Sequence, residues 1–180
     1  MSRFIALLLL ALVAAPIAVP TASANVAPLP GAIVTDGKEL RLLGEGRMRW
    51  FGLLLYDAAL WVSGPEWQWE QPFVLDIRYA RGFAGTRLAD ASADEIRRLG
   101  LADPVRLEAW RAEMRRVFPD VKSGDRISGV FRPGAGAEFF FQGRSIGMIR
   151  DPEFARVFFS IWLDPRTREP KLRAALLGRK

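Results

Sequence analysis

Four side chains of this 180-residue chain are suited to bind an acidic ligand, namely Arg47, Arg49, Tyr56 and Tyr79. A guanidinium group presents a planar set of N–H donors that matches a carboxylate through two parallel hydrogen bonds. The two tyrosines of the chain lie among apolar neighbours, where a buried hydroxyl needs a hydrogen-bond partner. The alternative interpretation is that the arginines are solvated at the entrance of a strand and that the tyrosines are core residues bonded to backbone.

Histidine and cysteine are both missing from the sequence. Without them the chain has no Ser-His-Asp triad, imidazole base, thiolate nucleophile or disulfide, and it lacks the usual ligands of zinc and haem. We therefore expect neither a metal nor a cofactor. Any chemistry must rest on Arg, Lys, Tyr, carboxyl or hydroxyl side chains, or on ordered water.

Two predicted strands carry the four candidate residues. The first covers Arg47–Val62, where both alternating faces are largely apolar, which indicates a central strand covered on two sides. A shorter strand over Leu40–Leu43 is expected to end at Gly44 and Gly46, just before this long strand. The second long strand covers Phe73–Arg81 and has one apolar and one more polar face.

The spacing within the first strand bears on whether the candidates can act together. Regular alternation puts Tyr56 on the opposite face from Arg47 and Arg49. A joint site therefore needs a β-bulge near Gly52, or it uses Tyr79 in place of Tyr56.

Helices are predicted in the middle and at the end of the chain. Ser92 and the glutamate three residues later form a capping box, so a helix is expected from Ser92 to a stop at Gly100. Asp103-Pro104 and Asp151-Pro152 each mark another helix start, and the residues after the second pair have the strongest helical periodicity of the chain. Pro170 begins a short last helix.

Three further strands are predicted between these helices, over Arg126–Arg132, Ala137–Phe141 and Ser145–Ile149. Strands, helices, strands and helices in succession indicate an α+β fold with a largely antiparallel sheet. Six apolar helix residues are candidates for the lining of a lipid cleft, although core packing is the commoner role of such a stripe: Trp110, Met114, Phe154, Phe158, Ile161 and Trp162.

Residues 1–24 are predicted to be a cleaved secretory signal peptide. Arg3 precedes an apolar run, and Ala22-Ser23-Ala24 is the small-x-small pattern that a signal peptidase reads. Prolines 16 and 20 interrupt the apolar segment, which argues against the alternative of an uncleaved membrane anchor. We expect residues 25–39 to be a mobile lead-in and residues 40–180 to form one domain of a periplasmic or secreted protein, with no integral membrane segment in the mature chain.

The balance of charges narrows the class of partner. The chain has 26 Lys and Arg against 20 Asp and Glu, a formal net charge of +6, which falls to +5 when Arg3 leaves with the signal peptide. Mild basicity in an exported protein favours an anionic lipid, a polysaccharide or an acidic small molecule. Nucleic acid is not expected, because the arginines do not gather in a basic run. Protein partners are left open.

Several motifs, taken in order along the chain, resemble those of the chalcone isomerase-like proteins, and most of all their exported bacterial branch. The resemblance covers roughly residues 40–178. It rests on three groups of residues: Gly44-x-Gly46-Arg47-x-Arg49 leading into Tyr56-Asp57-Ala58-Ala59-Leu60-Trp61; Gly124-Asp125 with Phe131-Arg132-Pro133-Gly134-Ala135-Gly136; and Gly143-Arg144-Ser145-Ile146-Gly147 with Phe154-Ala155, Ile161-Trp162-Leu163, Leu172-Arg173 and Leu176-Leu177-Gly178.

The resemblance implies an open-faced β-sandwich, in which a large antiparallel sheet is covered on one face by helices with an apolar cleft between them. It also implies one of two activities, because some members cyclise chalcones with an arginine, a tyrosine and small polar side chains, while related members bind fatty acids. The small polar side chains that the isomerases use have no clear counterpart after Tyr79 in this chain. Arg47 or Arg49 would match the family arginine.

The sequence therefore favours a non-catalytic binding protein for a small amphipathic carboxylate such as a fatty acid, held by Arg47, Arg49, Tyr56 and Tyr79. The first alternative is an isomerase or intramolecular lyase of the chalcone isomerase type. The second is a structural or partner-binding protein whose cleft is filled by side chains. A continuous cavity above ~300 Å³ with a guanidinium at one end would favour the first two over the third.

Overall fold

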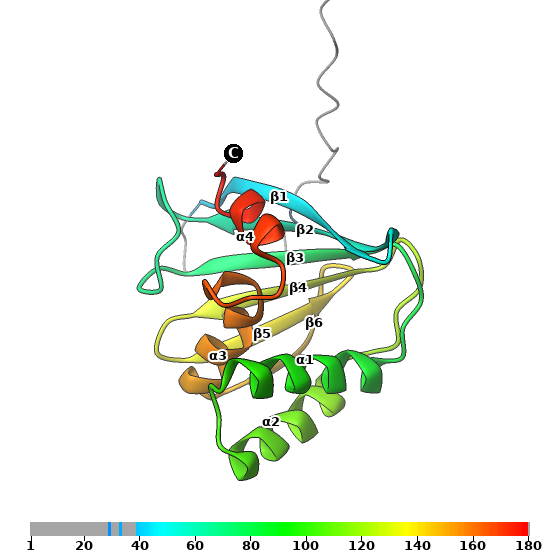
Figure 1. Cartoon of the computed structure of the whole chain (residues 1–180). Coiled ribbons are helices and arrows are strands. Elements are labelled where there is room, and N and C mark those ends of the chain that lie inside the picture. Colours follow the sequence, from blue (N-terminus) through cyan, green and yellow to red (C-terminus); the bar gives the residue numbers. More distant parts are fainter. Residues whose placement is uncertain (1–28, 30–32, 34–38, 180) are drawn as a thin grey trace, which may run out of the picture.

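The computed structural model describes residues 29, 33 and 39–179 of the chain, so the predicted signal peptide and most of the predicted lead-in lie outside the described residues. Six antiparallel strands form one sheet in the order β1-β2-β3-β4-β5-β6, and four helices cover one of its faces (Figure 1). This arrangement confirms the predicted α+β open-faced β-sandwich. The elements are β1 (Arg41–Trp50), β2 (Leu53–Val62), β3 (Phe73–Tyr79), α1 (Gly85–Leu99), α2 (Pro104–Val117), β4 (Arg126–Arg132), β5 (Gly136–Phe141), β6 (Arg144–Ile149), α3 (Pro152–Leu163) and α4 (Pro170–Leu176).

The segment predicted as one strand over Arg47–Val62 is a hairpin instead. A two-residue turn at Phe51 and Gly52 separates β1 from β2, and both turn residues have positive φ, 46° and 79°, as a type I′ turn requires. The sequence prediction was wrong because the apolar run continues through both strands and the turn lacks the usual Asn-Gly or Asp-Gly signal. Of the two strands, β1 forms an edge of the sheet and β2 lies inside it.

Gly44 and Gly46 lie within β1. The prediction that they end a strand was therefore wrong. They let α4 approach the sheet closely, since a Cβ atom on Gly44 would lie 2.1 Å from the carbonyl oxygen of Ala175. A Cβ atom on Gly46 would lie 2.7 Å from a methyl group of Leu172. The last helix therefore packs directly on the first strand.

Helix α1 begins seven residues before the predicted start. Its first amide, that of Gly85, donates to Asp120 Oδ1 at 2.8 Å, a carboxylate 35 positions further along the chain. Ser92 lies inside the helix and donates to the carbonyl oxygen of Leu88 instead of capping a helix. The predicted stop at Gly100 is confirmed, because this residue is the C-cap and has a left-handed φ of 68°.

The two Asp-Pro helix starts are confirmed at α2 and α3. Asp103 Oδ1 accepts hydrogen bonds from two amides of the first turn of α2, and Asp151 Oδ1 does the same for α3. The second oxygen of Asp151 also accepts the indole N–H of Trp110 at 2.8 Å. One carboxylate thus caps α3 and ties it to α2.

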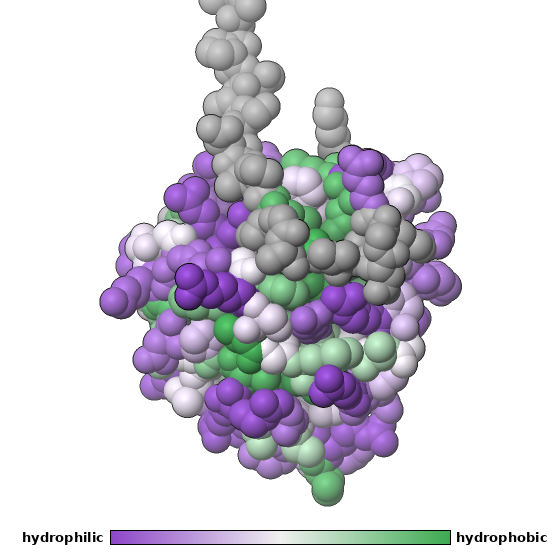
Figure 2. Space-filling view, turned by 180° about the vertical axis from the view of Figure 1, so that it is seen from behind, coloured by the Kyte–Doolittle hydropathy of each residue, from purple (hydrophilic) through white to green (hydrophobic). Residues whose placement is uncertain are grey.

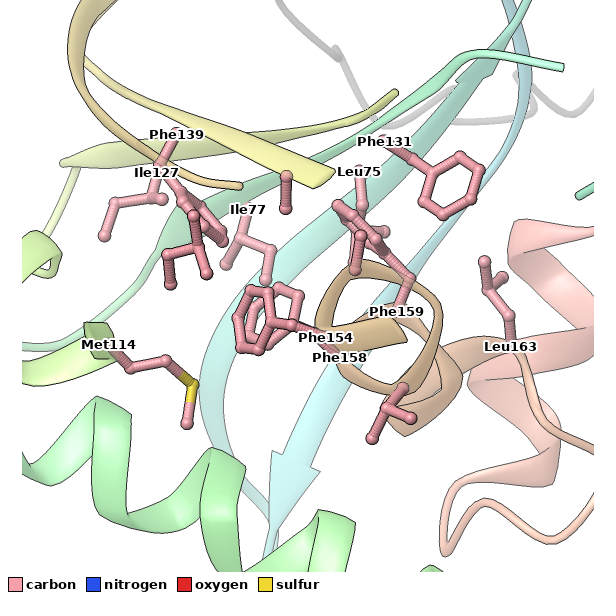
Figure 3. Close-up of a cluster of buried hydrophobic side chains, with 14 of the residues drawn as sticks. Leu75, Ile77, Met114, Ile127, Phe131, Phe139, Phe154, Phe158, Phe159 and Leu163 are labelled. Atoms are coloured by element: carbon pink, nitrogen blue, oxygen red, sulfur yellow. The ribbon is translucent and has the colours of Figure 1, made fainter. Parts of the chain in front are cut away.

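The two faces of the sheet carry different residues. The inner face packs against the helices in a large aromatic and aliphatic core (Figure 3). The rings of Phe73, Phe131 and Phe159 meet in it. The outer face mixes hydrophilic and apolar patches (Figure 2), and Val74, Val130 and Phe140 form a second, smaller buried cluster on it. There Asp76 is buried and accepts hydrogen bonds from Arg126 and Ser128, and burial raises the pKa of its carboxyl against the lowering effect of both partners.

Candidate functional site

A cavity of about 590 Å³ lies between the inner face of the sheet and the helical layer. Its walls come from β1 to β5, from α1, α3 and α4, and from the segment that leads into α4. Figure 3 shows part of its apolar wall, where side chains of β3, β4 and β5 face the aromatic residues of α3. The apolar residues lining it include Leu75, Ile77, Ile127, Phe139, Phe158 and Phe159.

The floor of the cavity includes a glycine, Gly129 on β4. A Cβ atom there would lie 3.1 Å from the ring of Phe159 and 3.4 Å from the ring of Phe139. The two phenyl rings therefore lie directly over the backbone of β4. Their packing sets how deep the cavity reaches at this end.

Tyr56 and Tyr79 both line the cavity, from neighbouring strands. They are direct partners in the register of β2 and β3, and their ring centroids lie 6.2 Å apart. Tyr56 Oη accepts a hydrogen bond from Trp162 Nε1 at 3.0 Å, which leaves its own proton free to be donated. The hydroxyl of Tyr79 has no hydrogen-bond partner within the described part of the chain. Two phenol donors are thus available to a ligand.

Burial keeps both phenols in the neutral form. The pKa of Tyr56 is raised from 10.0 to about 12: desolvation by burial raises it most, the hydrogen bond from Trp162 lowers it, and the nearby carboxylates Glu169 and Glu95 add a smaller increase. Desolvation also raises the pKa of Tyr79, with a smaller contribution from Tyr56. At physiological pH these groups are therefore hydrogen-bond donors and not bases.

Charged side chains line the cavity on α1 and on the segment before α4. They are two arginines and three carboxylates: Arg87, Arg168, Asp94, Glu95 and Glu169. Arg168 is paired with Glu95, Nε to Oε1 at 3.0 Å. Arg87 is exposed and has no ion pair with any described residue, so its guanidinium is the cavity cation that stays available to an anion.

The structure brings together two of the four predicted site residues and leaves the other two outside the cavity. Arg47 pairs with Asp57, Nε to Oδ1 at 3.1 Å, and both side chains are exposed. Arg49 donates to the carbonyl oxygen of Gly52 at 3.1 Å, across the hairpin turn. Their neighbours in β1, Met48 and Trp50, line the cavity instead. The register of β1 and β2 does shift between Met48 and Arg49, but the partner of Tyr56 is Met48, and the shift brings neither arginine opposite Tyr56.

The six apolar helix residues divide between cavity and core. Phe158, Ile161 and Trp162 line the cavity. Trp110, Met114 and Phe154 are buried in the core away from it. Sequence reasoning missed Arg87 and Arg168. Arg87 belongs to the part of α1 that was not predicted, and an α1 drawn from Gly85 would have shown Leu88, Ser92 and Glu95 on one face.

Residues 29, 33 and 39–179 contain neither a metal-binding cluster nor a membrane-spanning helix. No cluster of three or more carboxylate, histidine or cysteine side chains is arranged to hold a metal ion in this part of the chain. No helix of the described residues has the length and apolar character needed to cross a membrane.

Comparisons with known proteins extend the structural result. A family model described as chalcone isomerase-like matches residues 22–178. A Haemophilus influenzae protein described as uncharacterized is 28% identical over 138 residues, which are 76% of this chain and 67% of that protein. The crystal structure of a fatty-acid binding protein of Arabidopsis thaliana superposes with a TM-score of 0.59 at 12% identity, over 82% of this chain and 90% of that chain. The last likeness shows that the two proteins share a fold.

Proposed function

This chain belongs to the chalcone isomerase-like family, and from that premise we propose that it is a non-catalytic binding protein for a medium- or long-chain carboxylate, such as a fatty acid. We further propose that it acts in the periplasm or outside the cell, after cleavage of a signal peptide near Ala24. The Arabidopsis protein with the same fold is a fatty-acid binding protein, which supports this class of ligand.

The observation that carries the proposal is the cavity with its two phenol donors. A volume of about 590 Å³ falls within the range of sites that enclose small organic molecules, about 300–1,000 Å³. Such a space argues against a purely structural role with a filled cleft. Apolar walls suit a hydrocarbon tail, since each buried methylene contributes about 0.8 kcal/mol to binding.

The ligand's acid group is assigned to Tyr56, Tyr79 and Arg87. The two hydroxyls lie inside the apolar cavity and can donate to carboxylate oxygens. Arg87 provides the positive charge, because Arg168 is already paired with Glu95. Hydrogen bonds to a charged acceptor are shorter and about twice as strong as those between neutral groups.

One observation favours the isomerase as a second candidate. Two neutral phenols in a largely apolar cavity are suited to stabilise an oxyanion as it forms, which is a common way to accelerate a reaction. A phenol with a pKa of about 12 cannot remove a proton at neutral pH, so such a reaction would need another base or water. Incubation with a hydroxychalcone, followed by absorbance, tests this candidate directly.

The binding proposal is tested by calorimetry with dodecanoate and its methyl ester, after mass spectrometry of whatever ligand the purified protein retains. The acid should bind more tightly than the ester. The double variant Tyr56→Phe/Tyr79→Phe and the variant Arg87→Gln should each lose about ten- to a hundredfold in affinity for the acid, since a charged hydrogen bond contributes about 1.5–3 kcal/mol. Thermal denaturation of each variant checks that the fold is kept.

A parallel variant, Arg47→Gln/Arg49→Gln, tests the assignment made from sequence. Arg47 and Arg49 are exposed outside the cavity, so we expect the affinity for dodecanoate to stay within about twofold of the wild type. A loss confined to this variant would move the acid site to the β1–β2 hairpin. Equal affinities for acid and ester in every variant would refute carboxylate recognition altogether.

A further inference from the structure

The tip of the β1–β2 hairpin exposes large apolar side chains to solvent. Phe51 is 89% exposed, and Trp50 and Leu53 are each 51% exposed. The rings of Trp50 and Phe51 lie edge to face, with centroids 5.0 Å apart. Single exposed apolar residues are common on soluble proteins, but three gathered at one hairpin tip indicate a surface that meets a partner.

Phe51 is unfavourable at this position for a second reason. Its φ of 46° lies in the left-handed region, where the first residue of a type I′ turn is usually Asn, Asp or Gly. An asparagine would suit both the backbone and the solvent. A phenylalanine that is strained and exposed has no role in the stability of the turn, so a role outside the fold accounts for it.

Exposed cations lie at the end of the sheet that carries the tip. Arg49 lies on the hairpin itself, and Arg78, Arg81 and Lys122 are exposed and have no ion-pair partner among the residues that the structure describes. Backbone hydrogen bonds bring their segments together at this end of the sheet, from Ala80 to Leu55 and from Gly124 to Tyr79. Figure 1 shows the turn beside the connections that join β3 to α1 and α2 to β4.

We propose that this hairpin docks the protein on an anionic lipid bilayer. The apolar side chains of Trp50, Phe51 and Leu53 enter the interfacial region, where aromatic residues are favoured, and the surrounding cations contact acidic headgroups. Three side chains at one hairpin tip are too few for a stable protein–protein interface, which buries about 1,600 Å². They are sufficient for a shallow insertion into lipid.

The docking tip borders the cavity. Trp50 is exposed at the tip and also lines the cavity together with Met48 and Leu55. A docked protein would therefore hold this part of the cavity rim against the membrane. Docking itself requires only the tip and its cations, so it stands whether or not the cavity binds a fatty acid.

The test is sedimentation of the full mature protein with two kinds of vesicle, pure phosphatidylcholine and a 70:30 mixture of phosphatidylcholine and phosphatidylglycerol. The wild type should bind the anionic vesicles more strongly. Phe51→Asn should weaken partitioning by about ten- to a hundredfold, the equivalent of withdrawing one buried phenylalanine from an apolar environment. Its melting temperature should stay the same or rise, because asparagine suits the turn.

Two further variants separate charge from apolar contact. Arg78→Gln/Arg81→Gln should weaken binding to the anionic vesicles by about fivefold per cation and leave binding to the neutral vesicles unchanged. Val105→Asn removes another exposed apolar side chain, 82% exposed at the start of α2, and should bind like the wild type. An equal loss for Val105→Asn and Phe51→Asn would overturn the proposal.

Two other results would also overturn it. One is unchanged vesicle binding by Phe51→Asn. The other is that Phe51→Asn changes the oligomeric state seen by light scattering but does not change vesicle binding, which would make the tip a self-association surface. The ligand proposal fails separately: Tyr56→Phe/Tyr79→Phe should lower the affinity for dodecanoate and leave vesicle binding intact, whereas Phe51→Asn should do the reverse.

Discussion

Phe159 is the residue at which the stability of the fold and the size of the cavity are most directly linked. It is fully buried on α3, and its ring meets those of Phe73, Phe158 and Phe131, with centroids 5.1, 5.2 and 5.8 Å away. Phe→Ala in a packed core costs about 3–5 kcal/mol of unfolding free energy, and three aromatic contacts favour the upper end. At about 2–4 °C per kcal/mol for a chain of this size, Phe159→Ala should lower the melting temperature by roughly 6–20 °C.

The same truncation should change ligand binding, because Phe159 lines the cavity. Removing the ring extends the existing cavity over Gly129 instead of leaving an isolated void. Each additional methylene that a longer ligand buries there contributes about 0.8 kcal/mol. Hexadecanoate should therefore raise the melting temperature of Phe159→Ala by more than it raises that of the wild type, while dodecanoate should show a smaller difference.

Phe140→Ala is the matched control. Phe140 is 5% exposed and packs on the outer face of the sheet with Val74 and Val130, away from the cavity. Its truncation should also destabilise the protein, but hexadecanoate should shift its melting temperature only as much as that of the wild type. A melting temperature of Phe159→Ala within about 2 °C of the wild type would refute the packing of α3 on the sheet. Equal ligand shifts for the two variants would refute the link between Phe159 and the cavity.

Three other predictions follow from the described residues and the sequence. The two tyrosines should show no phenolate absorbance near pH 10–11 in the native protein, because the pKa of each is raised. The pKa of Tyr56 rises from 10.0 to about 12 on folding, so the stability linked to it is fully present below pH 10 and is lost as the pH rises toward 12. Denaturation at several pH values measures this loss. Asp103→Ala should lower the stability through the lost helix cap, whereas Asp151→Ala should cost more, about 2–4 kcal/mol, because it also leaves the indole N–H of Trp110 without an acceptor. Chemical denaturation compares the two, and equal losses would contradict the role of the Trp110 contact. N-terminal sequencing of the exported protein should begin at or near Asn25, and recovery of the full-length chain from the membrane fraction would contradict cleavage.

The parts of the fold that follow local chemistry could be predicted from the sequence. An aspartate before a proline specifies a helix start by itself, and the apolar periodicity after Asp151 specifies which face of α3 is buried. The alternation of Phe73, Leu75, Ile77 and Tyr79 likewise gave the inner face of β3. In each case the determining interactions lie within a few residues of one another.

The parts that depend on distant residues could not be predicted in this way. The start of α1 depends on Asp120, a partner from beyond the next helix, and the sequence near Gly85 contains no capping side chain. The β1–β2 turn was hidden because Phe51 is an unusual residue for a left-handed position. The resulting register decides which residues of β1 face inward, so the placement of Arg47 and Arg49 could not be derived before the turn was known.

The contact between α4 and β1 has a consequence for how the protein is made. The first strand of the sheet is covered by the last helix, and roughly 120 residues separate the end of β1 at Trp50 from the start of α4 at Pro170. On the ribosome and during export alike, β1 is delivered before this cover, because the chain is supplied from its N-terminus. Until α4 arrives, the face of β1 that holds Gly44 and Gly46 lies open to other chains. A holdase that shields β1 until the C-terminus is complete would therefore raise the yield of this protein, and deletion of α4 would make that need permanent.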